Sequence, residues 1–289
     1  MRLPQFQYFA PKSLDEACAL LGRYGAEASA LAGGTDLLVK MKQRRFVPAY
    51  VINLKTIGDL DYIRFDENDG LRIGALATIQ SIKNSVAVKR NCKVLNQAAG
   101  VESSVQIRNR ATIGGNIANA SPAADAPLAL LTVGASVILA RADGQREVLL
   151  EDFLTGPGRT GLQPGEVIRE IHVPRLAPGS GSAYLKHAVR RTDIAIVSAA
   201  VVLTLSKGVC ADVRIGLGSV APTAIRARKA EEMLKGQEIT KDLIKKAVEA
   251  AAAEAQPIDD IRGYAAYRAV TLRAVVEWVI TDAAKDAKL

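Results

Sequence analysis

The sequence is poor in the residues that most often form disulfides or hold metals. Its 289 residues include two histidines and three cysteines, Cys18, Cys92 and Cys210. The cysteines are odd in number and lie far apart without CxxC spacing, which argues against disulfides and metal sites. An iron–sulfur cluster usually takes four thiolates, so none is expected on this chain. We therefore predict reduced thiols in a cytoplasmic protein, with no metal ligands.

Long apolar runs and aromatic residues are also scarce. The longest apolar run, Ile194–Leu205, is far shorter than the roughly 18 residues of a membrane span, and the N-terminus lacks the apolar stretch of a secretory signal. Aromatic residues make up 4% of the chain, and the net charge of +8 divides into +4 before Ala177 and +4 from there onward. A diffuse charge with few stacking side chains disfavours a nucleic-acid partner.

The residues that are present favour a mixed fold. Hydrophobic residues make up 49% of the chain, enough for a large core at this length. Ser13 and Glu16 form a capping-box pattern before a helical run, Leu14–Leu21. Further elements are expected as a strand–glycine–helix stretch (residues 28–43), strands at 50–54, 71–76, 136–140 and 167–174, and helices from Thr78, at 86–99 and at 127–134.

The last third of the chain follows a different order. A turn-rich loop, residues 155–165, comes before the strand at 167–174, and "LAPGSGS", residues 176–182, is the best linker candidate. Three β-rich runs (183–189, 194–205 and 209–219) then precede three helical runs (223–235, 240–254 and 262–284). Strands followed by helices predict a separate α+β domain at the C-terminus.

Two glycine pairs stand out. "AGGTD", Ala32–Asp36, lies between a predicted strand and a helix that Thr35 or Asp36 would cap. Bare backbone N–H groups beside a helix N-terminus can bind phosphate, although a tight turn with a helix cap explains the same residues. Neither a GxxxxGK[ST] nor a GxGxxG motif occurs, so neither a P-loop nor a Rossmann dinucleotide site is supported.

The second glycine pair lies in "TIGGNIANASPAAD", Thr112–Asp125, which we expect to form a similar loop. It contains no His, Cys, Lys or Arg, and Asp125 stands close before a helix that it could cap. Two such segments without catalytic groups favour a long phosphorylated ligand held by many contacts. One helix terminus contributes only about 0.3–1 kcal/mol per charge, so both segments are needed for tight binding.

These segments carry a family resemblance. "AGGTDLLVKMK", "QIRNRATIGGNIANASPAAD", "GLQPGEVIREIHVP" and "SAYLKHAVRRTDIAIVSAA" occur in this order and spacing. Together they resemble the FAD-binding medium subunit of the molybdenum hydroxylases, which include carbon monoxide dehydrogenase, xanthine dehydrogenase and 4-hydroxybenzoyl-CoA reductase. The likeness spans nearly the whole chain.

The resemblance implies an α+β fold of the vanillyl-alcohol oxidase type. Residues 1–176 would form the FAD-binding domain, with subdomains of about 1–56 and 57–176. Residues 177–289 would form a C-terminal α+β domain with a three-stranded antiparallel sheet and three helices. The residues implied to bind FAD are Ala32, Gly33, Gly34, Thr35, Asp36, Ser103, Thr112, Ile113, Gly114, Gly115, Asn116, Asp125, Ile168 and Lys186. Asp125 would contact cofactor hydroxyls, and Lys186 is expected to be a flexible side chain that reaches FAD from the C-terminal domain.

The resemblance also implies partners and a role. A small subunit with [2Fe–2S] clusters and a large molybdenum-cofactor subunit would assemble with this chain, as a dimer of heterotrimers. The flavin would relay electrons between the clusters and an external acceptor such as NAD, a quinone, ferredoxin or oxygen, with no catalytic side chain here. The cysteine-rich insertion of the 4-hydroxybenzoyl-CoA reductase subunit is missing, which disfavours that member.

Two other classes of function stay open at this stage. A self-sufficient FAD oxidase would need its own acid–base residues or a covalent flavin ligand, and a non-enzymatic nucleotide-binding module would need neither. His172 and His187 are expected to be structural. The charged segment Arg190–Asp193 is a candidate docking neighbourhood for the iron–sulfur subunit, and Trp278 is expected in the core with Leu272, Val275, Val276 and Val279.

Overall fold

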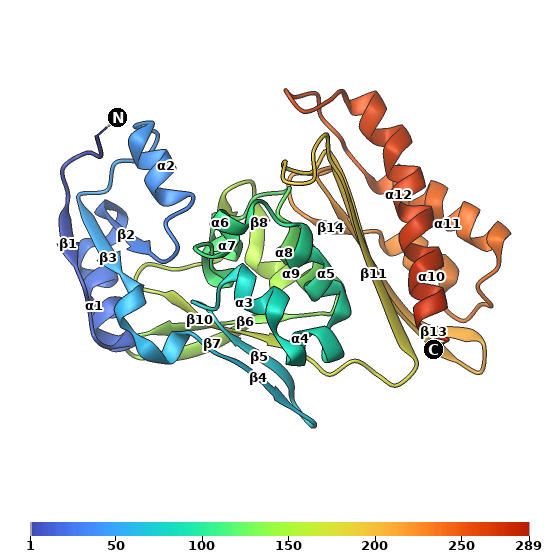
Figure 1. Cartoon of the computed structure of the whole chain (residues 1–289), viewed down its shortest axis with the longest axis horizontal. Helices are drawn as coiled ribbons and strands as arrows, with labels where there is room; N and C mark the ends of the chain where they lie inside the picture. The colour runs from blue at the N-terminus through green and yellow to red at the C-terminus, as the bar shows by residue number, and fades with distance from the viewer. Residues whose placement is uncertain (1, 289) are drawn as a thin grey trace.

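The computed structural model describes residues 2–288, which form three successive α+β parts (Figure 1). The first part has a parallel sheet in the order β1–β3–β2. Ser13 caps the first helix by accepting from the Glu16 N–H, and Glu16 accepts from Lys12, so the capping pattern is confirmed. The elements are β1 (Gln7–Phe9), α1 (Leu14–Tyr24), β2 (Ala28–Leu31), α2 (Leu37–Lys42), β3 (Tyr50–Asn53) and three short 3₁₀ turns (Gly25–Glu27, Leu54–Thr56 and Gly58–Leu60).

The middle part has a five-stranded antiparallel sheet in the order β4–β5–β10–β6–β7. Its strands are β4 (Ile63–Asp66), β5 (Gly70–Gly74), β6 (Ser136–Arg141), β7 (Gly144–Leu149) and β10 (Val167–Val173). Its helices are α3 (Ile79–Asn84), α4 (Val86–Asn91), α5 (Lys93–Val101), α6 (Val105–Arg108), α7 (Ile113–Asn119), α8 (Asp125–Thr132) and α9 (Leu150–Phe153). A small hairpin, β8 (Leu154–Gly156) and β9 (Arg159–Thr160), lies within the predicted turn-rich loop.

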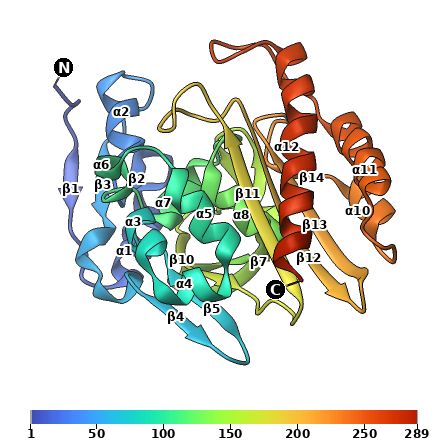
Figure 2. The same ribbon diagram turned by 45° about the vertical axis from the view of Figure 1, so that its right-hand side comes forward.

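The last part is a second antiparallel sheet with helices on its outer side (Figure 2). The strands are β11 (Ser180–His187), β12 (Val197–Ser206), β13 (Val209–Gly218) and β14 (Ile225–Arg226), followed by α10 (Arg228–Leu234), α11 (Lys241–Glu254) and α12 (Ala265–Asp286). Helices α5 and α8 pack on one face of this sheet and α12 on the other. Three clusters of buried apolar residues accompany the three parts, and the predicted domain boundaries stay predictions.

Several sequence expectations need correction. The expected helix 86–99 is two helices, because Cys92 adopts φ −150° and ψ 67° and so breaks the helical path while its side chain stays buried. The C-terminal sheet has a fourth, two-residue strand, too short to show a period in the sequence. Strand β11 begins at Ser180, inside the expected linker, because the segment pairs with β12. Trp278 is 45% exposed rather than buried.

Candidate functional site

The first glycine segment, Ala32–Asp36, lies at the carboxyl end of β2 and leads into α2. Gly34 has φ +77°, a conformation that favours glycine. Asp36 stands at the N-cap position of α2, but its side chain makes no cap hydrogen bond. The Asp36 carboxylate instead accepts from the Asn119 amide at 3.2 Å, so Asp36 holds the expected N-cap position while its side chain bridges to the other segment.

The second glycine segment is the start of a helix rather than a loop. Thr112 caps α7, its hydroxyl accepting from the Gly115 N–H at 3.2 Å. The Gly114 N–H donates to the Ala75 carbonyl, and a Cβ on Gly114 would lie 2.7 Å from that of Ala75. Here glycine permits close packing of α7 against the chain that follows β5.

The two glycine segments meet at one junction between the first and middle parts of the fold. A Cβ on Gly33 would clash with the carbonyl of Arg110, directly before the second segment. A Cβ on Gly115 would lie 3.9 Å from that of Ala32. Asn119 joins the two sides by hydrogen bonding to Asp36 and to Lys40. The residues predicted from two distant stretches are therefore brought together.

Lys55 adds positive charge to this junction, and sequence analysis missed it. Its ammonium group donates to the Ala32 carbonyl at 3.0 Å. Burial, and then the nearby Arg110 guanidinium, lower the pKa of Lys55. The available signal was its position just after β3, since ligands of open parallel sheets lie beyond the carboxyl ends of the strands.

A buried polar cluster lies beside the junction. Lys186 pairs with Asp125 at 2.9 Å, and Lys186 also donates to the Val101 carbonyl at 2.7 Å. The Tyr184 hydroxyl donates to the other Asp125 oxygen. The side chains of Lys186 and Asp125 are 4% and 6% exposed, so Lys186 is not the flexible side chain that was expected. Asp125 is the first residue of α8 and Ala124 is the N-cap, so the alternative that Asp125 caps the helix is wrong.

Glu102 extends this cluster toward α7. One of its carboxyl oxygens accepts from the Asn116 amide at 2.9 Å. The other oxygen is buried without a hydrogen-bond partner, and so is the amide oxygen of Asn116. Burial, followed by the neighbouring Asp125 carboxylate, raises the pKa of Glu102 to about 8, with Lys186 opposing. Sequence analysis did not single out Glu102, because a lone glutamate in a helical stretch carries no pattern.

Burial and ion pairing act in opposite directions on Asp125. Burial raises its pKa, while Lys186 and the Tyr184 hydroxyl lower it. The pKa of Tyr184 is raised well above its usual value, first by burial and then by the Asp125 charge. The cluster is therefore a low-dielectric site in which the charged groups depend on one another.

Ser103 and Ile168 flank the site in different ways. Ser103 has φ +48°, and the buried Arg108 guanidinium fixes this turn by donating to the carbonyls of Glu102 and Ser103 at 2.9 and 2.8 Å. Ile168 is 5% exposed and packs in the main core on β10. The backbone links β10 to the junction, because the Arg169 carbonyl accepts from Ala75.

Comparison with known proteins gives this site a context. Residues 4–176 match the model of the FAD binding domain in molybdopterin dehydrogenase, and residues 182–283 match the carbon monoxide dehydrogenase flavoprotein C-terminal domain. The chain belongs to the molybdopterin dehydrogenase FAD-binding family. The cofactor of this family domain is FAD, as the sequence resemblance implied.

Individual family members are similar over the full length. The carbon monoxide dehydrogenase medium chain of Hydrogenophaga pseudoflava is 38% identical over 97% of both chains. The glyceraldehyde dehydrogenase medium chain of Sulfolobus acidocaldarius is 32% identical over 98% of both. Among solved structures, a carbon monoxide dehydrogenase chain from H. pseudoflava has a TM-score of 0.95, covering 98% of each chain at 38% identity. A quinoline 2-oxidoreductase chain from Pseudomonas putida has a TM-score of 0.94 at 31% identity, covering 100% of each.

The residues present fit the family cofactor. The junction offers an N-capped helix start, a glycine at positive φ and the Lys55 ammonium, all of which suit an anion. The two buried oxygens without hydrogen-bond partners, on Glu102 and Asn116, suit a ligand that carries hydroxyl groups, because a hydroxyl can donate to the Asn116 oxygen and can pair with either form of the Glu102 carboxyl.

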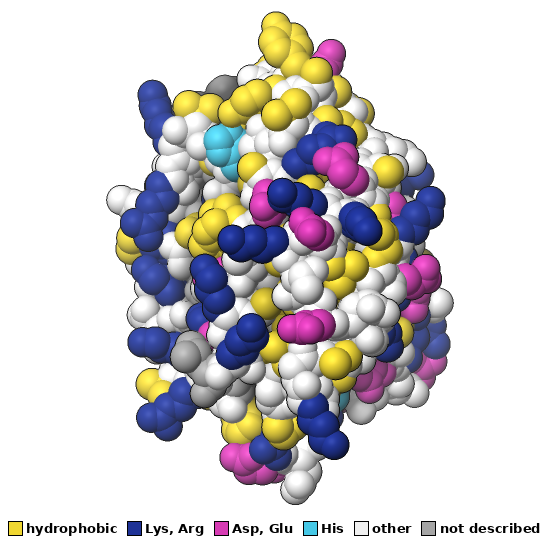
Figure 3. Space-filling model, turned by 90° about the vertical axis from the view of Figure 1, so that its right-hand side faces the viewer, with side chains coloured by type: hydrophobic (Ala, Val, Ile, Leu, Met, Phe, Trp, Pro, Cys, Tyr) yellow, Lys and Arg dark blue, Asp and Glu magenta, His cyan; other side chains and the backbone are white. Residues whose placement is uncertain are grey.

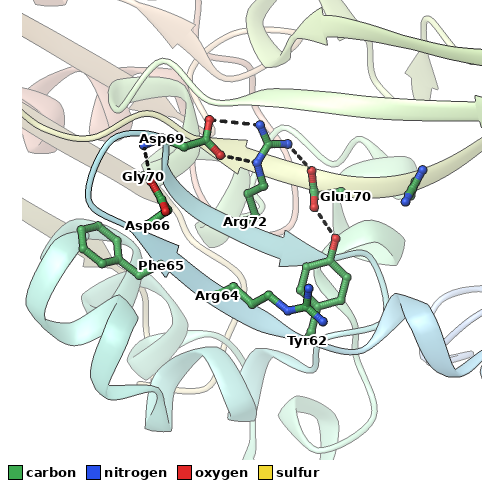
Figure 4. Close-up of a pocket in the computed structure, with 9 residues that line it drawn as sticks. Tyr62, Arg64, Phe65, Asp66, Asp69, Gly70, Arg72 and Glu170 are labelled. Atoms are coloured by element: carbon green, nitrogen blue, oxygen red, sulfur yellow. Dashed lines mark hydrogen bonds and ion pairs between the residues drawn. The ribbon is translucent and has the colours of Figure 1, made fainter.

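A hollow lined mainly by charged side chains of β4, β5 and β10 lies apart from the candidate FAD site (Figure 4). Arg72 pairs with Asp69 and with Glu170, and the Tyr62 hydroxyl donates to Glu170. His172 bonds the Asp69 carbonyl at 2.8 Å, which suits the structural role expected of it. Asp69, Arg72 and Glu170 satisfy one another, so they form an ion-pair network across β5 and β10.

Proposed function

We propose that FAD binds at the junction of the two glycine segments, with its pyrophosphate beside Ala32–Asp36 and Thr112–Asn116. The observation that carries the proposal is the meeting of these segments at one place with Lys55. Helix α7 begins at this junction, and the dipole of a helix N-terminus attracts negative charge even where its first N–H groups are bonded within the protein. A cationic side chain near the same backbone strengthens that attraction.

The remaining site residues would position the rest of the cofactor. Glu102 and Asn116 offer oxygens without hydrogen-bond partners, while Asp125, Tyr184 and Lys186 form a fixed polar wall. Ser103 would lie close to this wall, and Ile168 would support it from the core. When bound, FAD supplies electron transfer; the protein supplies binding, orientation and a low-dielectric environment.

We further propose that the chain relays electrons within a larger complex. Its relatives are named as medium chains or as subunits, among them a 6-hydroxypseudooxynicotine dehydrogenase complex subunit and a putative xanthine dehydrogenase FAD-binding subunit. A small [2Fe–2S] subunit and a large molybdenum-cofactor subunit would be its partners, in a dimer of heterotrimers. Substrate chemistry would take place on the large subunit, and an external acceptor would receive electrons from the flavin.

The proposed complex is cytoplasmic. The three cysteines are all free and buried, as suits a reducing compartment. Among residues 2–288, no helix is long and apolar enough to cross a membrane.

One purification tests this function. The chain, isolated from its source, should be yellow, with an absorbance maximum at about 450 nm, and it should release FAD on denaturation. It should copurify with iron- and molybdenum-containing subunits, identified by mass spectrometry and metal analysis. Substrate turnover by the chain alone would instead establish a self-sufficient oxidase. A colourless chain that binds no FAD would favour the third class, a non-enzymatic binding module.

A further inference from the structure

Helix α12 is apolar on two faces. Its inner face packs into the C-terminal core through Leu272, Val275, Val276, Val279, Ile280 and Ala283. Its outer face carries Tyr267, Val270, Ala274 and Trp278, spaced by three or four residues and all exposed, with Val270 at 68%. Exposed apolar side chains at helical spacing form a stripe along the outer face, which a partner could cover.

Two loops continue this apolar face beyond the start of α12. The loop before α12 carries Ile258, Ile261 and Tyr264, and the β11–β12 loop carries Val189 and Ile194. Ile261 is fully exposed at 105% and Val189 at 76%. Apolar side chains gather at one end of this side of the molecule (Figure 3). Contiguous exposed apolar patches mark interaction sites.

Hydrogen bonds join the two loops to each other and β11 to α12. Arg262 donates to the Ala195 carbonyl at 3.1 Å, and His187 bonds the Tyr267 hydroxyl at 2.9 Å. Beneath them, the fully buried Arg268 pairs with Asp260 at 2.6 Å and donates to two backbone carbonyls, each at 2.9 Å. Docking onto a surface ordered in advance costs less conformational entropy. We call the exposed apolar residues of the two loops and the outer face of α12 the docking surface: Val189, Ile194, Ile258, Ile261, Tyr264, Tyr267, Val270, Ala274 and Trp278.

One edge of the docking surface, at the β11–β12 loop, is cationic, whereas the exposed acidic residues Asp259 and Glu277 lie elsewhere on it. Arg190 and Arg191 are exposed on the β11–β12 loop. Arg191 also lines a groove of about 480 Å³ together with Lys83 and Lys89. None of these four cations forms an ion pair with a described carboxylate. Asp193, the only acidic residue of the loop, accepts from the Arg190 backbone N–H. A partner with an acidic rim would complement this charge.

Through Arg191, the groove borders the β11–β12 loop at one edge of the docking surface. Its lining includes Val101, whose carbonyl accepts from Lys186, and Tyr184, whose hydroxyl donates to Asp125. A protein that docks here therefore lies beside the polar wall of the site. A second copy of this chain would bring the same unpaired arginines, and so suits this edge less well.

We propose that the docking surface binds the partner subunit with which the flavin exchanges electrons, a protein with an apolar centre and an acidic rim. This proposal rests on the proposed function. It extends the docking neighbourhood expected at Arg190–Asp193 to the outer face of α12 and the loop before it.

Two variants test the proposal in the full chain. Ile261→Asp and Arg191→Glu are each titrated against the purified subunits that copurify with the unaltered chain. Ile261→Asp should weaken binding at least about 30-fold, as expected for an apolar hot spot. Arg191→Glu should weaken binding about tenfold at low salt and less at about 1 M salt, where charges are screened. Both should keep wild-type FAD content and melting temperature, because both side chains are exposed.

Matched controls come from elsewhere on the surface. Leu149→Asp on β7, where Leu149 is 54% exposed, and Lys245→Glu on α11 should bind the partner subunits as the wild type does. If Ile261→Asp and Arg191→Glu also bind like wild type, the docking surface is wrong although the flavin function stands. If the isolated chain dimerises and Ile261→Asp abolishes only the dimer, the surface joins two copies and the proposal is overturned. Recovery of the native chain without FAD or partner subunits would overturn the proposed function first, and this proposal with it.

Discussion

At the scale of single residues, the most unusual group is the Glu102 carboxyl. It is buried beside Asp125, and one of its oxygens lacks a donor. Burial raises its pKa from 4.5 to about 8, so near neutral pH the folded protein keeps a proton that the unfolded chain has lost. Stability must therefore fall as pH rises between these two values, and level off above about pH 8.

Glu102→Gln should remove this pH dependence. The fall in unfolding free energy should reach at most about 1.4 kcal/mol per pH unit in the wild type. The variant should be as stable as the wild type near pH 4.5. At pH 8 it should be more stable by roughly several kcal/mol, because the wild type has then lost the stability linked to its raised pKa. Chemical denaturation of the FAD-free chains from pH 5 to 9 measures the difference. Parallel curves for the two proteins would show that Glu102 does not hold the proton.

Asp125 and Lys186 should act as a unit. Removing either partner leaves a buried charge uncompensated, which costs about 3–5 kcal/mol. Asp125→Ala and Lys186→Ala should therefore both lower the midpoint of urea unfolding, and the double variant should lose less than the sum of the two. Additive losses would mean that the pair is not coupled. The expectation that Asp125→Ala weakens FAD binding more than Lys186→Ala stays a prediction, to be measured on variants that remain folded.

At the scale of elements, the glycine segments connect two parts of the fold. Gly33 lies against the backbone of Arg110, and Gly114 against Ala75. Backbone cannot yield as a flexible side chain does, so these glycines are required by packing as well as by ligand approach. Loss of FAD in a glycine variant therefore needs a separate measure of folding.

Gly33→Ala should destabilise the FAD-free chain by about 1–3 kcal/mol, because the added methyl group would clash with the Arg110 carbonyl. Gly100→Ala is the matched control, since Gly100 lies within α5 with open space around its Cβ. That change should be neutral or stabilise by up to about 1 kcal/mol. Thermal unfolding compares the two; equal effects would show that the junction is looser than its geometry indicates.

At the scale of the whole molecule, FAD binding should stabilise the junction between the first and middle parts. A ligand that binds only the folded state at about 100 times its Kd contributes roughly 2.7 kcal/mol. Thermal unfolding of the FAD-free chain, with and without added FAD, should show a matching rise in melting temperature. The rise should shrink in Gly115→Val, whose side chain would crowd Thr112 at the start of α7. An unchanged melting temperature in the wild type would contradict this binding site.

Much of the fold followed from local sequence patterns. The α1 capping box, the start of α3 at Thr78, and the strands β2, β3, β6 and β10 lie where period and capping residues predict them. These features depend on contacts a few residues apart, which a sequence displays directly. The glycine segments were likewise visible as candidates for ligand binding, and their family resemblance is confirmed over the whole length.

Only the tertiary structure decided what those patterns touch. The sequence by itself determined the family and many of the longer elements, because periodicity, caps and motifs are local, but short elements such as β1, α7 and β14 were missed. It did not show that Gly33 contacts Arg110 or that Lys186 forms an ion pair with Asp125. Nor did it show that one carboxyl oxygen of Glu102 is buried without a hydrogen-bond partner. It also placed Trp278 in the core, because helical period reveals an apolar face but not whether another element covers it. The Asp125–Lys186 pair, for example, depends on residues 61 apart in sequence packing into one low-dielectric site, which local sequence patterns do not record.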